Sequence, residues 1–296
     1  MSFFAKEKII AGDNFNRWWA VPAALGVHLS IGQVYAFSVF KLPLTRALGI
    51  IQSVEGDWSQ SDIGWIFSIA ILFLGLTAAF AGKWAVKKGE RLTMFLSALC
   101  FGGGFIIAAF GIYLHQLWLM YVGYGVLGGI GLGLGYVAPV TMLMRWFPDR
   151  PGMATGLAIM GFGGGAFVAS PLSVSLMKFY STDVSNGVFE SFLTMGVIYT
   201  LIIIMSSIIV RVPKEGWLPK TMDKNMPLLD KYGNKVSDVL GVESISADVA
   251  MKSRSFYMLW LVLVLNVTAG IGLIYQASPM VQELFPEKVS VELAAL

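Results

Sequence analysis

The chain has 296 residues, of which 56% are hydrophobic and only 13% are charged, with a formal net charge of +3. A water-soluble domain carries about a quarter charged residues. The composition therefore excludes a soluble fold and predicts an all-α membrane protein, for which no nucleic-acid partner is expected.

Seven apolar runs with few charges follow one another along the chain. Each is about long enough to cross a hydrocarbon core of about 30 Å as a helix. The first is too long for the apolar part of a cleaved signal peptide, so we expect it to be retained. The runs are Arg17–Phe40, Asp62–Ala81, Leu92–Tyr113, Leu117–Val140, Pro151–Met177, Phe189–Val210 and Ser255–Met280.

Lysine and arginine are distributed unequally between the two sides of this arrangement. If the N-terminus is cytoplasmic, 4 of the 21 basic residues fall outside and all the others fall inside. This bias predicts a multi-pass protein of a plasma membrane, such as a bacterial inner membrane, with a cytoplasmic N-terminus. The four outside are Lys41, Arg46, Lys178 and Lys288.

A polar stretch separates the sixth run from the seventh. We predict a cytoplasmic N-terminus at 1–16, a six-helix half at 17–210, a cytoplasmic linker at 211–254, and helix seven with the start of helix eight at 255–296. Six spans, a basic linker and a restarting helical series are typical of a secondary carrier with two halves. The odd number of spans leads us to expect a chain truncated at its C-terminal side.

Glycine recurs every four residues in the fourth and fifth runs. Such stripes of small residues let helix backbones approach closely in lipid, so we expect these two helices to lie deep in contacts. The stripes are Gly125, Gly129 and Gly133; Gly131 and Gly135; Gly152 and Gly156; and Gly161 and Gly165.

Two expected cytoplasmic turns carry further signals. Gly82 to Arg91 is a basic segment with glycines seven residues apart, which could form a specific turn. Its composition alone is equally consistent with an ordinary cytoplasmic loop rich in basic residues. In the next cytoplasmic turn, Asp149 is placed to cap the fifth helix, with Pro151 in its first turn.

Several longer stretches have characteristic sequence motifs: Asn16–Trp18, Val21–Ala24, Ile31–Phe40, Gly123–Tyr136, Trp146–Arg150 and Asn266–Gly272. Together with Gly82–Arg91, they resemble the major facilitator superfamily, and in particular its oxalate/formate antiporter branch. The segment Gly82–Arg91 departs from the superfamily's loop motif in one respect. Val86 stands where the motif has an acid, and Glu90 replaces a usual basic residue.

This resemblance implies an alternating-access carrier in which two six-helix halves rock about a midplane site. It implies a small carboxylate as substrate, such as oxalate, formate or a related monocarboxylate, and no cofactor or metal. The chain would supply the first half, the linker and helix seven, and its partners would be the carboxylate, the lipid bilayer and a missing C-terminal half. Gly82, Lys87, Gly89 and Arg91 would belong to the gating loop.

The resemblance also implies that cations of the second half hold the anion, while aromatic and polar residues of helices one and four form the opposite wall. No Lys or Arg lies near the middle of the seven runs. The candidates for binding substrate are Tyr35 and Tyr124, followed by Gln33, Tyr136 and His28.

Each candidate has a structural alternative. The tyrosines and Gln33 could serve helix packing, and His28 could be either a proton-coupling group or a neutral histidine bonded to another helix. At 3.6 residues per turn, Tyr35 lies about 20° from His28 and Gln33 about 140° away, so they cannot all face one cavity.

Other classes of protein fit less well. A carrier-derived sensor that binds carboxylates without transporting them stays open as the alternative function. A complete seven-helix receptor or retinal protein would explain the span count and ranks third. A retinal protein also needs a lysine in its last span, which Ser255–Met280 lacks. An enzyme is not expected, because no acid, base or metal-binding groups cluster near the membrane.

Overall fold

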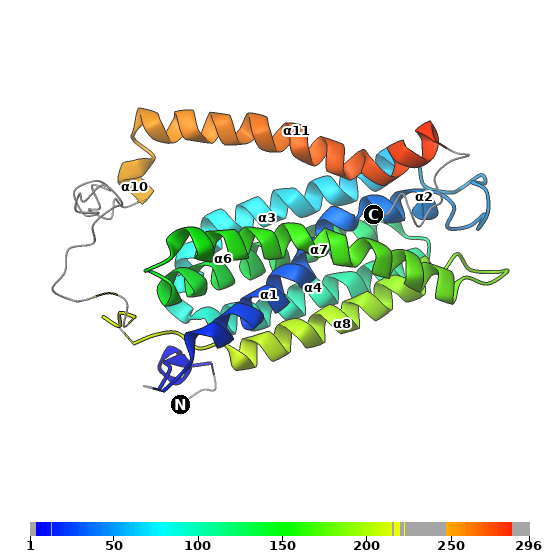
Figure 1. Ribbon diagram of the computed structural model, residues 1–296. Coiled ribbons are helices and arrows are strands. Elements are labelled where there is room, and N and C mark those ends of the chain that lie inside the picture. Colours follow the sequence, from blue (N-terminus) through cyan, green and yellow to red (C-terminus); the bar gives the residue numbers. More distant parts are fainter. Residues whose placement is uncertain (1–3, 13, 215, 220–221, 223–246, 286–296) are drawn as a thin grey trace. The chain divides into compact units, whose positions relative to one another are not determined.

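The computed structural model describes residues 4–12, 14–214, 216–219, 222 and 247–285, and nearly all of its regular structure is helical (Figure 1). The chain divides into two compact units, Met1–Lys214 with Tyr275–Leu296, and Glu215–Ile274. Residues 223–246 of the predicted linker, Lys288 and the expected start of helix eight lie outside the described residues.

The first unit contains six membrane-length helical segments. The first is a bent pair: Arg17–Ala36, which includes α1 (Ala20–Ile31) and a 3-10 stretch Gly32–Ala36, meets α2 (Ser38–Leu44) at 46°. The others are α3 (Gln60–Lys88), α4 (Glu90–Tyr113), the fourth span Leu117–Trp146, α7 (Pro151–Tyr180) and α8 (Val188–Ile209). A short 3-10 turn, Lys6–Ile9, precedes them.

The fourth span changes its helical type along its length. It begins as α5 (Leu117–Met120), widens into a π-helical stretch over Tyr121–Gly128, and continues as α6 (Gly129–Trp146). The remaining helices of the described residues are α10 (Ala247–Ala250) and α11 (Arg254–Leu284). Helix α11 is also long and apolar enough to span a membrane, which gives seven such segments in the described residues when the bent pair counts as one. The prediction of an all-α membrane protein is confirmed.

Helix α1 lies at the centre of the bundle. It packs against α6, α7 and α8, while α4 packs against α6 and α8, and α3 packs against α6 (Figure 1). Most of the predicted glycine stripes lie at these contacts. A Cβ on Gly129 would come 2.6 Å from a backbone oxygen of α3, and one on Gly131 would come 2.4 Å from a backbone nitrogen of α4.

The tightest stripe joins the first span to α7. A Cβ added to Gly165 would lie 2.6 Å from the Cα of Gly32, and one added to Gly32 would lie 2.0 Å from the carbonyl oxygen of Phe162. Neither helix therefore tolerates a side chain at this crossing, and the two backbones touch directly. Close approach of this kind is what small residues permit between membrane helices.

The expectation for Gly152 and Gly156 is wrong. A Cβ at either position would meet no atom within 4 Å among the described residues, and both residues are exposed. They lie in the first turns of α7, where the described part of the chain places no other helix against that face. Spacing by four shows that two glycines share a face, but it does not show that the face is covered.

Gly165→Ala is expected to destabilise the bundle, whereas Gly163→Ala in the same helix is not. A Cβ at Gly165 would clash with backbone atoms, while one at Gly163 would meet nothing within 4 Å. Overpacking costs about 1–3 kcal/mol, but alanine in an open helical position gains up to about 1 kcal/mol over glycine. Thermal unfolding of the purified variants in detergent compares the two, and equal midpoints would contradict the close crossing.

Candidate functional site

Three of the predicted site residues gather around one ring of α7. The ring of Phe162 has its centroid 5.0 Å from that of Tyr35, 5.3 Å from that of Tyr136 and 6.5 Å from that of His28. The rings of His28 and Tyr136 are 5.9 Å apart. We call these four residues the Phe162 cluster.

The glycine crossing explains why the cluster forms. Phe162 lies one turn before Gly165, and the direct contact of Gly165 with Gly32 brings the first span within reach of that ring. Gly161 has the same effect one residue earlier, since a Cβ there would lie 2.9 Å from the Cβ of His28. The glycines thus determine where the aromatic side chains lie.

The members of the cluster differ in burial. His28 is fully buried, and its Nε2 lies 3.3 Å from the backbone carbonyl oxygen of Tyr136, to which it donates. Tyr35 and Tyr136 are only half-buried. The cluster therefore combines one buried imidazole with two tyrosines that are partly accessible.

Tyr124 and Gln33 form a separate pair inside the bundle. Tyr124 is 1% exposed and donates its hydroxyl hydrogen to Oε1 of Gln33 at 3.0 Å. The rings of Phe37, Phe105 and Phe192 surround it at centroid distances of 4.9–6.0 Å. Gln33 thus contacts Tyr124 whereas His28 and Tyr35 contact Phe162, and the Tyr124 hydroxyl ties the fourth span to the first.

Lys41 follows the first apolar run and was predicted to lie outside the membrane. The first span does not end at Phe40 but continues to Leu44, and Lys41 is 2% exposed within it. Its Nζ donates to Oε1 of Gln276 at 2.5 Å and lies 4.6 Å from the ring centroid of Tyr275, in the same compact unit. The first span therefore carries a buried cation near its C-terminal end. The flexible four-carbon stem of lysine lets its charge reach partners that a hydropathy pattern does not reveal.

The predicted gating loop is almost entirely helical. Gly82 and Lys87 lie within α3, and Gly89, with φ 98°, is the single residue that separates α3 from α4. Arg91 is buried and donates to the carbonyl oxygens of Ser207, Ile208 and Val210 at 3.2–3.4 Å. It thereby satisfies carbonyl groups at the C-terminal end of α8, which have no partners within the helix.

The unusual acid of that motif has a partner in the fourth span. Oε1 of the buried Glu90 lies 3.0 Å from Nη1 of Arg145, which is partly exposed. The replacement of a basic residue by Glu90 is therefore matched by a cation on the neighbouring helix.

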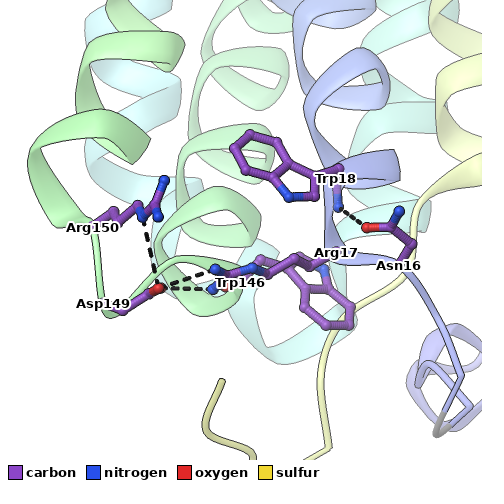
Figure 2. A network of polar contacts seen from close by, with 6 residues as sticks. All are labelled: Asn16, Arg17, Trp18, Trp146, Asp149 and Arg150. Atoms are coloured by element: carbon purple, nitrogen blue, oxygen red, sulfur yellow. Dashed lines mark hydrogen bonds and ion pairs between the residues drawn. The ribbon is translucent and has the colours of Figure 1, made fainter. Parts of the chain in front are cut away.

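Two of the characteristic stretches meet at the end of the bundle that we predict to be cytoplasmic. Arg17 donates from Nη1 and Nη2 to the two carboxylate oxygens of Asp149, at 2.7 and 3.0 Å (Figure 2). Arg17 also donates to the carbonyl oxygen of Trp146 at 3.3 Å, and the indole N–H of Trp146 donates to the carbonyl oxygen of Arg211 at 2.7 Å. This network joins the start of the first span to the turn after the fourth and to the end of α8.

The prediction that Asp149 is the cap of α7 is wrong, because Arg150 occupies the N-cap position, and both carboxylate oxygens of Asp149 accept from Arg17. Helix α7 does begin at Pro151, as predicted, but Arg150 stands before it without a side-chain cap. The arginine offers the carboxylate two parallel charge-assisted hydrogen bonds, which favours this pairing.

At the opposite end, Asp57 organises the connection between α2 and α3. Its carboxylate accepts from the backbone N–H groups of Leu48, Gly49 and Val54 at 2.8–3.3 Å. Burial alone would raise the pKa of Asp57, but these three donors and the nearby His115 outweigh it and lower the pKa below its usual value of 3.8. His115 also stacks on Trp58, with ring centroids 4.5 Å apart.

These observations define a multi-pass helical membrane protein with a closely packed six-helix bundle. The chain belongs to the Major Facilitator Superfamily, whose family model matches residues 23–294, and it is therefore related to membrane transporters.

Three relatives show the range of the similarity. The chain is 24% identical to the uncharacterized MFS-type transporter YhjX of Escherichia coli, over 90% of this chain and 58% of that protein. It is 23% identical to the apicoplast pyruvate carrier 1 of Toxoplasma gondii, over 90% of this chain and 61% of that protein. It is 24% identical to the oxalate:formate antiporter of Oxalobacter formigenes, over 83% of this chain and 51% of that protein. The chain thus spans little more than half the length of these relatives.

Tyr124→Phe is expected to lower stability, whereas Tyr35→Phe is not. Loss of the Tyr124 hydroxyl leaves Gln33 without its donor in a buried site, at a cost of about 1–3 kcal/mol. Tyr35 is half-buried and contacts Phe162 through its ring, which the substitution keeps. Unfolding of the purified variants in detergent measures both. The double variant Tyr124→Phe, Gln33→Leu should recover most of the lost stability. If it does not, the hydrogen bond between Tyr124 and Gln33 is not what stabilises this site.

Asp57→Asn is expected to loosen the connection between α2 and α3. A carboxyl with a lowered pKa contributes stability that is complete above its unfolded pKa, near 3.8, and is lost as the pH falls further. Protection of the Leu48, Gly49 and Val54 amides from hydrogen exchange should therefore persist down to about pH 4 and decline below it. Asp57→Asn should reduce this protection at neutral pH, and Asp183→Asn, on another loop, should not. Unchanged protection in Asp57→Asn would show that the carboxylate does not hold the loop.

Proposed function

We propose that the chain forms part of an alternating-access carrier that moves small carboxylate anions across a plasma membrane, such as a bacterial inner membrane, with its N-terminus in the cytoplasm. The names of two relatives, a pyruvate carrier and an oxalate:formate antiporter, support the substrate class. The distribution of lysine and arginine supports the orientation.

Buried Lys41 is the observation that carries this proposal. An ionisable group within a membrane span is costly and in general marks a functional site. The hydrogen-bond partner of Lys41, Gln276, is neutral, and Glu283 is the acid that acts on it at longer range. A carboxylate would supply the opposite charge that a buried ammonium group requires.

The Phe162 cluster fits a second part of the same path. Tyr35 and Tyr136 offer hydroxyl donors from half-buried positions, and His28 provides a buried imidazole. His28 and Tyr35 precede Lys41 along the first span, so an anion held by Lys41 would meet the cluster deeper in the membrane. In this proposal the cation attracts the carboxylate, and the tyrosine hydroxyls accommodate its oxygens as it moves.

Lys41→Gln in the complete gene product is expected to raise the KM for carboxylate exchange at least about tenfold. The substitution keeps a hydrogen-bond donor but removes the charge, and a charged hydrogen bond contributes about 1.5–3 kcal/mol. Exchange of labelled oxalate, formate and pyruvate in proteoliposomes measures the effect. Lys252→Gln, which removes an exposed charge near the start of α11, is the matched control.

Two outcomes would count against the proposal. Absence of saturable exchange of all three anions by the unaltered protein would exclude this substrate class. An unchanged KM in Lys41→Gln would show that Lys41 does not contact the substrate.

A further inference from the structure

A cavity of about 390 Å³ opens where α2 and α7 end, on the side that we predict to face outward. Two cations line it, Arg46 just after α2 and Lys178 in the last turn of α7. Ser181 and Asn186 add polar groups, and apolar side chains such as Leu42 and Met177 form much of the remaining wall. We call this space the outer cavity.

The backbone that carries Arg46 is fixed by several hydrogen bonds. Nδ2 of Asn186 donates to the carbonyl oxygens of Pro43 and Arg46 at 2.9 and 3.2 Å. The N–H of Ile50 donates to the same oxygen of Arg46 at 2.8 Å. These bonds tie the end of α2 to the loop between α7 and α8, so the position of Arg46 is set by the fold on both sides of the cavity.

The outer cavity gathers the few cations of its side. Only four basic residues fall outside in the predicted topology, and three of them belong to the described part of the chain. Arg46 and Lys178 line the cavity, and Lys41 is buried within two turns of Arg46 along the chain. One acid, Glu283, shares an adjacent space of about 600 Å³ with Arg46. The three described cations of the side that we predict to face outward thus lie at or near one cavity.

We propose that Arg46 and Lys178 form a capture site that draws carboxylate anions into the outer cavity before they reach Lys41. This inference rests on the proposed function for the identity of the anion. Cations in a concave site with apolar walls focus the electric field and raise the local concentration of anions. The effect reaches about one Debye length, or about 8 Å at physiological ionic strength, so salt should weaken it.

Transport kinetics provide the first test. Arg46→Gln and Lys178→Gln should each raise the KM for external oxalate about threefold or more at low ionic strength, with kcat unchanged, because they alter encounter and not the later steps. The difference should shrink in about 0.5 M salt, where the Debye length is only a few ångströms. Lys252→Gln is the control and should show no such change. A salt-independent effect, or none, would overturn the capture site.

A chemical test needs no transport at all. Ser181 lines the outer cavity, and Cys100 is the only cysteine of the 296 residues. Ser181→Cys, with Cys100 and any further cysteine of the complete gene product replaced by Ala, therefore provides a single reporter thiol. Impermeant anionic and cationic methanethiosulfonates are applied to intact cells, and the ratio of their reaction rates reports the local potential. We expect the anionic reagent to be favoured and the ratio to fall at least about twofold in Arg46→Gln.

The two tests separate this inference from the proposed function. A ratio that falls with Arg46→Gln supports the capture site even if the unaltered protein exchanges none of the three carboxylates, a result that would count against the proposed function alone. A ratio that Arg46→Gln leaves unchanged overturns the capture site. Lack of reaction with either reagent would show that the cavity does not face outward and would overturn it as well.

Discussion

Direct contact between the backbones of the first span and α7 is the constraint from which the candidate site follows. Gly32 and Gly165 leave no room for a Cβ on either helix. In a membrane, where apolar side chains gain little by leaving lipid, close contact of this kind is a main source of helix association. It also fixes the depth at which Phe162 meets His28 and Tyr35. The aromatic chemistry of the site is therefore a consequence of two residues that have no side chains.

Much of this arrangement could be predicted from the sequence. The long apolar runs identify the spans, and the glycine spacing identifies residues that share a helix face. That face is a contact face at Gly129 and Gly131 but not at Gly152 and Gly156. The angular relation of His28, Gln33 and Tyr35 was also predictable, because a helix places residues seven apart on nearly the same face. The structure brings His28 and Tyr35 to one ring and directs Gln33 to Tyr124.

The failures have a common physical origin, which is that partners distant in sequence decide local structure. Asp149 is a residue type that often caps helices and lies close to the start of α7, yet both of its oxygens accept from Arg17, at the start of the first span. Lys41 marks the end of an apolar run, yet Gln276 lets it remain buried inside a helix. The local type of helix could not be predicted from the sequence either. Nothing in the sequence indicated the π-helical stretch around Tyr124, a kind of irregularity that is frequent at functional sites.

The one-residue connection at Gly89 has a consequence for anyone who modifies this protein. Its φ of 98° is open to glycine but strained for other residues, and its carbonyl oxygen accepts from both the N–H and the hydroxyl of Thr93. Helices α3 and α4 are thus joined by a single residue, with no loop between them. An epitope tag or fluorescent-protein fusion inserted there would have to break a helix to fit, although the basic sequence around it looks like an ordinary loop. Topology mapping by insertion should use other connections.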